Sequence, residues 1–152
     1  MTGSPIQKKT VTILMADDDE DDRMLTEEAM KESRLLNDLH FVNDGEQLCE
    51  YLEGNGKYSD RSIYPMPGLI LLDLNMPRMD GREALQRIKA NASLRRIPVV
   101  ILTTSQAEED MLKTYDLGAA SYITKPVSFD ALVQILQKLG EYWVEVVQLP
   151  ST

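Results

Sequence analysis

The sequence predicts an α/β protein in which a five-stranded, doubly wound parallel sheet carries helices on both faces. Five short apolar runs alternate along the chain with segments of 3.6-residue periodicity, and strict alternation of this kind is typical of doubly wound sheets. Several runs are almost continuous in aliphatic and β-branched residues, as expected for parallel strands buried on both faces. The predicted strands are Val11–Ala16, Leu39–Val42, Leu69–Leu72, Val99–Leu102 and Ser121–Ile123.

Helical segments separate these strands. Gly81–Ala90 and Glu108–Leu117 show a helical period, and a glycine follows the second of them where its C-terminus is expected. Asp19 is a natural N-cap for the helix after the first strand, because acidic residues that suit a helix N-terminus come next. The last helix is expected over Phe129–Val147, and residues 54–68 are expected to form an extended loop. The last helix should face the sheet with a stripe made of Leu132, Leu136, Leu139, Trp143 and Val146.

Length and composition indicate one soluble domain. For a chain of 152 residues we expect a flexible leader at 1–10, a folded domain at 11–147, a short tail at 148–152 and no output domain. A net charge of −9 without a block of basic residues argues against nucleic-acid binding. No apolar run is long enough to span a membrane, and the single cysteine, Cys49, excludes an internal disulfide. These features favour a cytoplasmic protein.

Polar side chains that can carry chemistry follow four of the five predicted strands. Asp17 and Asp18 follow the first strand, and Asp73 follows the third in GLILLDLNMPRMDG. A run of hydroxyl residues that begins at Thr103 follows the fourth strand, and Lys125 follows the fifth. Because the carboxyl ends of parallel strands lie at one edge of a sheet, we expect these groups to converge on one crevice.

The converging groups suit the binding and transfer of a phosphoryl group. Three carboxylates in one place repel one another unless a cation joins them. Hard oxygen donors without thiolate or imidazole suit Mg²⁺, which prefers phosphate partners. With Mg²⁺ and the Lys125 ammonium balancing its charge, a phosphoryl group is open to attack by the Asp73 carboxylate, which forms an acyl phosphate. The hydroxyl of Thr103 is placed to donate to a phosphoryl oxygen.

Four motifs in order make the chain resemble the response-regulator receiver domains of two-component signalling, over roughly residues 11–147. They are the acidic pair Asp17-Asp18, the acceptor in LILLDLNMPRMDG, the hydroxyl in VVILTTS, and YITKP. The separations of Thr103 and Lys125 from Asp73 are also those of the family. The resemblance implies a flavodoxin-like receiver fold with strand order 2-1-3-4-5 and five helices.

The resemblance also implies a role for each matching residue. Asp18 and Asp73 would bind Mg²⁺ directly, with Asp17 binding directly or through water, and Asn75 would contribute its backbone carbonyl. Asp73 would accept the phosphoryl group from a sensor histidine kinase or a phosphotransfer partner. Asn75 and Ser105, at positions that flank the phosphate, would tune the rate at which water attacks the acyl phosphate.

Other matching residues would bind the phosphate or report its presence. Lys125, held by a cis peptide bond to Pro126, would bind a phosphoryl oxygen, and Thr103 and Thr104 would bind the phosphate with it. On phosphorylation Thr103 would rotate towards the phosphate, and Tyr122 would turn inward to fill the space it left. These two residues would form the switch.

The nearest likeness is to small regulators that partner bacterial phytochrome-type histidine kinases. It rests on DDDEDDRML, on a loop with GKYSD, on DMLKTYDLGAASYITKPV and on a late helix carrying Tyr142 and Trp143. The last helix is apolar beyond its stripe, for example at Phe129 and Val133, which favours a homodimer formed through the fourth and fifth helices and the fifth strand. The alternative is a core helix with a few exposed apolar residues.

Other functions fit part of this pattern. A metal-dependent phosphohydrolase of the haloacid-dehalogenase type passes through an aspartyl phosphate, but it uses a second Asp where this chain has Asn75. An intermediate carrier in a phosphorelay would pass the phosphoryl group onward. A scaffold independent of phosphorylation is disfavoured by the complete acceptor set. We therefore expect a switch that catalyses only its own phosphorylation and dephosphorylation, not a metabolic enzyme.

Overall fold

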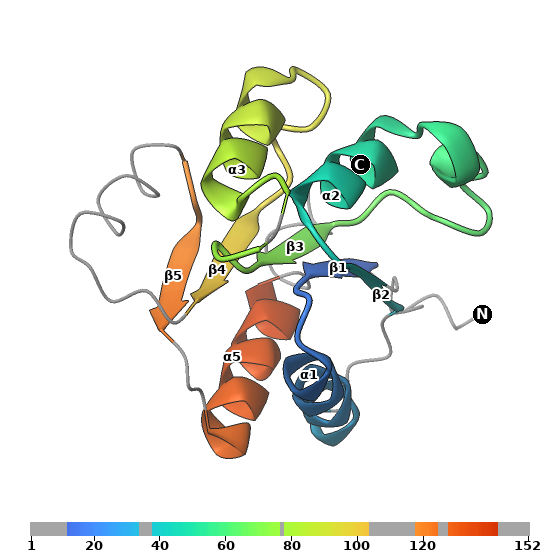
Figure 1. The fold of residues 1–152 in the computed structure, drawn as a ribbon. Helices are drawn as coiled ribbons and strands as arrows, with labels where there is room; N and C mark the ends of the chain where they lie inside the picture. The colour runs from blue at the N-terminus through green and yellow to red at the C-terminus, as the bar shows by residue number, and fades with distance from the viewer. Residues whose placement is uncertain (1–11, 34–37, 77, 104–117, 125–127, 143–152) are drawn as a thin grey trace.

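A computed structural model describes residues 12–33, 38–76, 78–103, 118–124 and 128–142, which form a three-layer α/β fold (Figure 1). The central sheet has five strands in the order β2-β1-β3-β4-β5, and every neighbouring pair is parallel. The predicted sheet and its strand order are therefore confirmed. The strands are β1 (Ile13–Ala16), β2 (Leu39–Val42), β3 (Leu69–Leu72), β4 (Val99–Thr103) and β5 (Ser121–Thr124).

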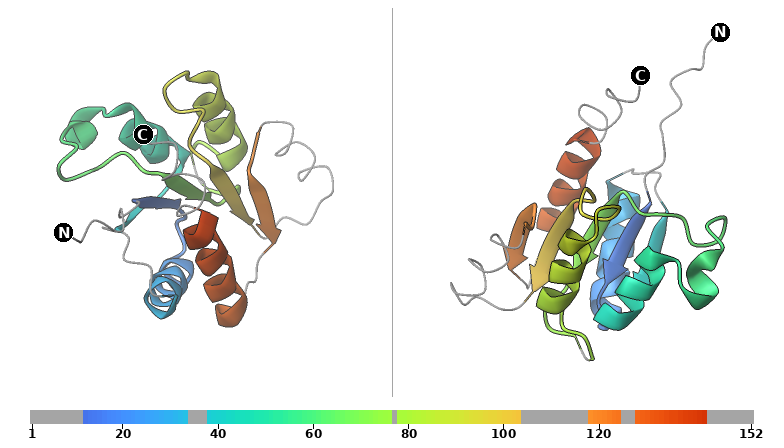
Figure 2. Two further views of the ribbon diagram at one scale, coloured as in Figure 1. Left: turned by 180° about the vertical axis from the view of Figure 1, so that it is seen from behind. Right: turned by 90° about the horizontal axis from the view of Figure 1, so that it is seen from above.

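Helices cover both faces of the sheet. The helices α1 (Glu20–Glu32) and α5 (Phe129–Tyr142) lie on one face, and α2 (Gly45–Glu53) and α3 (Gly81–Ala90) lie on the other, as the front and back views agree (Figure 2). The expected helix Glu108–Leu117 lies outside the described residues, as do residues 143–147 of the last helix. Within the described part, no helix has the length and apolar character needed to cross a membrane.

Three strands differ from the prediction at one of their two bounds. β1 begins at Ile13, Thr12 lies before the strand, and Val11 is outside the described residues. β4 and β5 each extend one residue further than predicted, to Thr103 and Thr124. The prediction ended β4 and β5 at their last apolar residue. Backbone hydrogen bonding continues past that point, because Thr103 and Thr124 are register partners in the parallel ladder.

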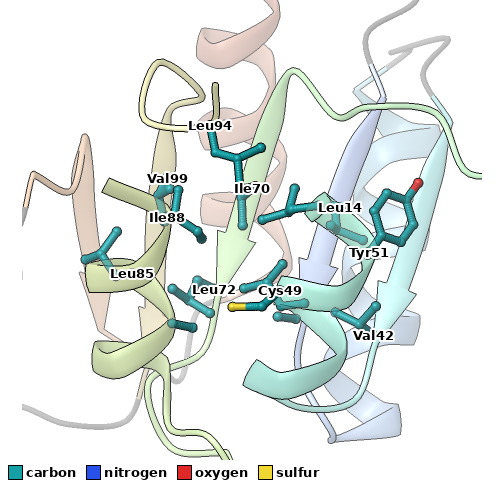
Figure 3. Close-up of a cluster of buried hydrophobic side chains, with 14 of the residues drawn as sticks. Leu14, Val42, Cys49, Tyr51, Ile70, Leu72, Leu85, Ile88, Leu94 and Val99 are labelled. Carbon is teal, nitrogen blue, oxygen red and sulfur yellow. The ribbon is translucent and has the colours of Figure 1, made fainter. Parts of the chain in front are cut away.

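The two faces of the sheet bury separate hydrophobic layers, because successive strand residues point to opposite sides. The layer under α2 and α3 includes Leu14, Ile70, Leu72 and Val99 from the strands, and Figure 3 shows helix residues packing onto them. The layer under α1 and α5 takes the alternate strand residues. These are Ile13, Met15, Leu69, Leu71, Val100 and Leu102, with Leu132 and Leu136 from α5.

The segment between α2 and β3, expected as an extended loop, is folded against the domain. It contains a short 3₁₀ helix, η1 (Gly56–Ser59). The Tyr58 and Tyr64 rings pack on Tyr51 with centroid separations of 5.1 and 5.8 Å. The Arg61 guanidinium donates to the carbonyl oxygen of Tyr51 at 2.8 Å, at the C-terminal end of α2. An aromatic cluster and one arginine therefore hold this segment against α2.

Three helices on the carboxyl side of the sheet begin with an aspartate N-cap. Asp19 accepts hydrogen bonds from the amides of the first turn of α1, as predicted. Asp44 and Asp80 do the same for α2 and α3. These caps fix where each helix begins relative to the strand end before it.

Candidate metal centre at the carboxyl edge of the sheet

The register of β1 and β3 places two aspartates side by side. Ala16 and Leu72, the last residues of these strands, are register partners, so Asp17 and Asp73 follow at equivalent positions. The Asp73 amide donates to the Ala16 carbonyl at 3.0 Å and continues the ladder by one bond. One carboxylate oxygen from each of Asp17, Asp18 and Asp73 lies within 4.8 Å of the others. The predicted convergence of these three side chains is confirmed by their positions.

The three carboxylates differ in burial. Asp17 has no exposed surface and Asp73 is 8% exposed, whereas Asp18 lies open to solvent. Hydrogen bonds orient the two buried groups: the Asp19 amide donates to Asp17 Oδ1 and the Asn75 amide donates to Asp73 Oδ1, each at 2.9 Å. Buried carboxylates this close together repel one another strongly, because little water screens them. A divalent cation that accepts hard oxygen ligands fits this donor set.

A close backbone approach shapes the loop that follows Asp73. Gly81, the first residue of α3, donates its amide to the Leu74 carbonyl at 2.9 Å. A Cβ atom at this position would lie 2.5 Å from the Asp73 carbonyl oxygen and 2.6 Å from Leu74 Cα. Only glycine allows α3 to begin so close to the residue that carries the carboxylate. The Asp80-Gly81 pair therefore contributes a cap and a close contact to the geometry around Asp73.

The other predicted site residues are placed only in part. Thr103 ends β4, opposite Thr124, so the backbones that lead into the polar residues after β4 and after β5 lie next to each other. Tyr122 is half-buried in β5 and packs against the hydrophobic layer under α2 and α3. The Thr103 side chain lies outside the described part of the structure. The same applies to Thr104, Ser105, Lys125 and Pro126.

The sequence analysis did not identify Arg23 as part of this region. From the first turn of α1, its Nε donates to the Asp17 carbonyl oxygen at 2.7 Å. Its Nη2 donates to the Val42 carbonyl at 3.1 Å and to Asn43 Oδ1. The only signal in the sequence was a single cation directly after the acidic run DDDEDDR. That pattern alone does not separate a solvated arginine from one that binds the ends of two strands.

Known proteins share this fold and sequence pattern. The model of the response regulator receiver domain matches residues 13–137. The response regulator Rcp1 of Synechocystis sp. is 40% identical over 139 residues, which cover 91% of this chain and 92% of Rcp1.

Solved structures agree with this match. The phosphorylated cyanobacterial phytochrome response regulator RcpA superposes with a TM-score of 0.81 and 39% identity, over 94% of this chain and 100% of RcpA. The Mn²⁺-bound form of Rcp1 superposes with a TM-score of 0.78 and 40% identity, over 93% of this chain and 99% of that one. By its sequence, its strand order and its acidic cluster, the chain belongs to the response regulator receiver domain family.

Proposed function

We propose that Asp73 accepts a phosphoryl group in a Mg²⁺-dependent reaction and that the aspartyl phosphate switches the surface of the domain. The observation that carries the proposal is the cluster of Asp17, Asp18 and Asp73, whose ligand oxygens lie within 4.8 Å of one another. Asp73 sits at the end of a central strand, nearly buried and oriented by the Asn75 amide. That is the placement a carboxylate nucleophile requires.

Asp17, Asp18 and Asp73 would hold the metal, with the backbone carbonyl of Asn75 as a further ligand. A bound Mg²⁺ neutralises phosphoryl oxygens and lowers the cost of bringing an anion to a carboxylate. The Asp73 carboxylate would attack phosphorus while the bond from phosphorus to the donor breaks and the donor's leaving group departs, and Lys125 and Thr103 would bind the phosphoryl oxygens. That a homologue is described in a Mn²⁺-bound form supports a divalent cation at this site.

The test is phosphorylation by acetyl phosphate labelled on phosphorus. We expect one phosphoryl group per chain, stable to acid and labile to alkali, that requires Mg²⁺ and is abolished in Asp73→Asn. Asp60→Asn is the matched control, because Asp60 is an exposed aspartate in the segment before β3. Labelling of Asp73→Asn at the wild-type level would overturn the assignment.

The phosphoryl donor would be a sensor histidine kinase of the phytochrome type. The support is the similarity to RcpA and Rcp1, since RcpA is described as a phytochrome response regulator. Phosphotransfer from a purified phytochrome-type kinase, compared with transfer from an unrelated histidine kinase, tests this partner. Equal rates from both kinases would argue against it.

Thr103 and Tyr122 would carry the signal away from Asp73. Tyr122 lies in β5, is half-buried and packs against the hydrophobic layer under α2 and α3. An inward rotation of its ring would bury it further. A fluorinated tyrosine at this position would report that movement by fluorine NMR. We expect its resonance to shift when wild-type protein is phosphorylated and to stay in place in Asp73→Asn.

The domain would also form a homodimer through the fourth and fifth helices and the fifth strand. The supporting observation is Phe129, which is 37% exposed at the start of α5 while Leu132 and Leu136 are buried. Sedimentation of wild type and Phe129→Ser, with and without phosphorylation, tests the interface. We expect the substitution to weaken dimerisation, and an unchanged dimer would contradict this assignment of α5.

The site also bears on the rival function, a phosphohydrolase. The side chain of Asn75 stands where such an enzyme needs an acid, and its backbone N–H donates to Asp73 Oδ1. An amide side chain cannot donate and recover a proton as a general acid does. We therefore expect single labelling without turnover of small phosphomonoesters, and sustained turnover would favour the enzyme instead.

A further inference from the structure

The Arg23 guanidinium lies between the carboxyl ends of β1 and β2. It donates from Nε to the Asp17 carbonyl oxygen at 2.7 Å and from Nη2 to the Val42 carbonyl oxygen at 3.1 Å. The same Nη2 also donates to Asn43 Oδ1. The Arg23 Cζ atom lies 5.1 Å from the centre of the Phe41 ring, which supports the guanidinium plane from β2. The side chain is half-buried, so these bonds are partly shielded from water.

Both backbone groups of Asp17, its amide and its carbonyl, are hydrogen-bonded in this region. Its amide donates to the Val42 carbonyl at 3.1 Å, and its own carbonyl accepts from Arg23. That carbonyl belongs to the peptide plane between Asp17 and Asp18. Its direction therefore sets the direction in which the backbone of Asp18 continues. The hydrogen bond from Arg23 to this carbonyl therefore lies directly behind the two neighbouring carboxylates.

We propose that Arg23 is a positioning residue of the metal centre, which acts through the Asp17 backbone and not on the metal or the phosphate itself. The inference rests on the proposed metal site at Asp17, Asp18 and Asp73. It explains a feature that simple electrostatics does not: a cation in the first turn of α1, close to a cluster that binds a cation. Charge repulsion alone would make Arg23 weaken metal binding.

Arginine suits this role because its donors are arranged in a rigid planar fork. Two strand-end carbonyls and an amide oxygen are reached at fixed directions, which a lysine ammonium on a flexible stem does not reproduce. Groups behind the ligands of a metal site commonly change affinity by roughly 10- to 100-fold when they are removed. Positioning and charge therefore predict effects of opposite sign on metal affinity.

Calorimetric titration of Mg²⁺ and of Mn²⁺ into the purified protein separates these effects. Arg23→Lys keeps the charge and loses the fork, so we expect its Kd to rise by roughly 10-fold. Arg23→Gln also removes the repulsion, and we still expect weaker binding than in wild type. Wild-type affinity in Arg23→Lys, or tighter binding in Arg23→Gln, would overturn the proposal.

Two further variants keep the result interpretable. Lys31→Gln removes one positive charge from the last turn of α1, where Lys31 forms an exposed pair with Glu28 at 3.6 Å, and should bind metal within about two-fold of wild type. Asn43→Ala removes one acceptor of Arg23 without changing any charge. It should weaken binding by a smaller factor, and an unchanged Kd would count against positioning even if Arg23→Lys did not fold.

Failure of this inference is distinct from failure of the proposed function. If wild type bound no divalent cation, or if Asp73→Asn bound the cation as tightly as wild type does, the metal site itself would be wrong. If wild type bound the cation and the Arg23 variants bound it equally well, only the positioning role would be wrong. Thermal unfolding of each apoprotein checks that the folded fraction is the same at the temperature of the titration.

Discussion

Asp44 and Arg78 join the start of α2 to the loop that follows Asp73. Asp44 Oδ2 lies 3.8 Å from Arg78 Nε, and the Asp44 side chain is 5% exposed whereas that of Arg78 is 67% exposed. Asp44 also caps α2 by accepting from the Gln47 amide at 2.8 Å. Next to it, the Gly45 amide donates to the Met79 carbonyl at 3.1 Å. The loop between β3 and α3 is therefore held against α2 as well as against β1.

Arg78 combines this ion pair with an unfavourable backbone conformation. Its φ of 66° makes it the one residue other than glycine in the left-handed region among those the structure describes. We expect Arg78→Gly to be more stable than Arg78→Ala by about 1 kcal/mol, because alanine keeps the strain and glycine relieves it. Both variants lose the ion pair, which cancels in the comparison. Urea unfolding measures the difference, and equal stabilities would mean that the loop carries no strain at Arg78.

The contact between Gly81 and Asp73 predicts a linked loss of stability and phosphorylation. In Gly81→Ala the new Cβ meets backbone atoms of Asp73 and Leu74, which cannot move without moving the acceptor. We expect a loss of about 1–3 kcal/mol and slower labelling by acetyl phosphate. Gly56→Ala is the control: its Cβ meets nothing within 4 Å, although its φ of 58° is strained. It should lower stability and leave the labelling rate unchanged.

Much of the fold and the acidic cluster could be predicted because both depend on local pattern. Buried parallel strands read as continuous apolar runs, and their ends identify the edge where side chains such as Asp17 and Asp73 meet. The register Ala16 with Leu72 then brings these two residues together without any further signal. Residue type and strand position were sufficient for this part of the site.

The supporting contacts could not be predicted in the same way. Arg23 acts through a few hydrogen bonds to carbonyl and amide oxygens, and Arg78 through an ion pair with one carboxylate. Such contacts have no periodic pattern in a sequence. No predicted metal or phosphate ligand follows β2, so nothing in the sequence points to its last carbonyl, that of Val42. The packing of Tyr58 on Tyr51 likewise depends on how an irregular segment folds back.

Cys49 should be an unreactive thiol in the native protein. It is a buried residue of α2, and burial raises its pKa to about 11 from the ordinary 9.0. We expect thiol reagents to label it only at the rate of unfolding, and at the full rate in denaturant. Rapid labelling of the folded protein at pH 8 would contradict this burial.

The same shift gives a direction for stability at high pH. The unfolded thiol loses its proton near pH 9 while the folded one keeps it until about pH 11. The unfolded state then binds fewer protons, so stability falls as pH rises between these values. Tyr51, whose pKa burial raises to about 12, adds a fall that begins near pH 10. In Cys49→Ala the fall should be smaller, which urea unfolding at pH 8 and pH 10.5 would measure.

Removal of the charge at Asp17 should have opposite effects on the stability of the protein in the absence and in the presence of the metal. Asp17→Asn keeps an oxygen that can accept from the Asp19 amide, and it removes a charge from the fully buried carboxylate of the cluster. In a chelator we expect the variant to be more stable than wild type, by on the order of 1 kcal/mol, because repulsion within the cluster is relieved. With Mg²⁺ the order should reverse. Wild type gains about 2.7 kcal/mol when the metal is at 100 times its Kd, while the variant binds weakly and gains little.

Asp19→Asn is the control, since asparagine also caps helices and Asp19 is not in the cluster. It should gain as much from Mg²⁺ as wild type does, and an equal gain in Asp17→Asn would exclude Asp17 as a ligand.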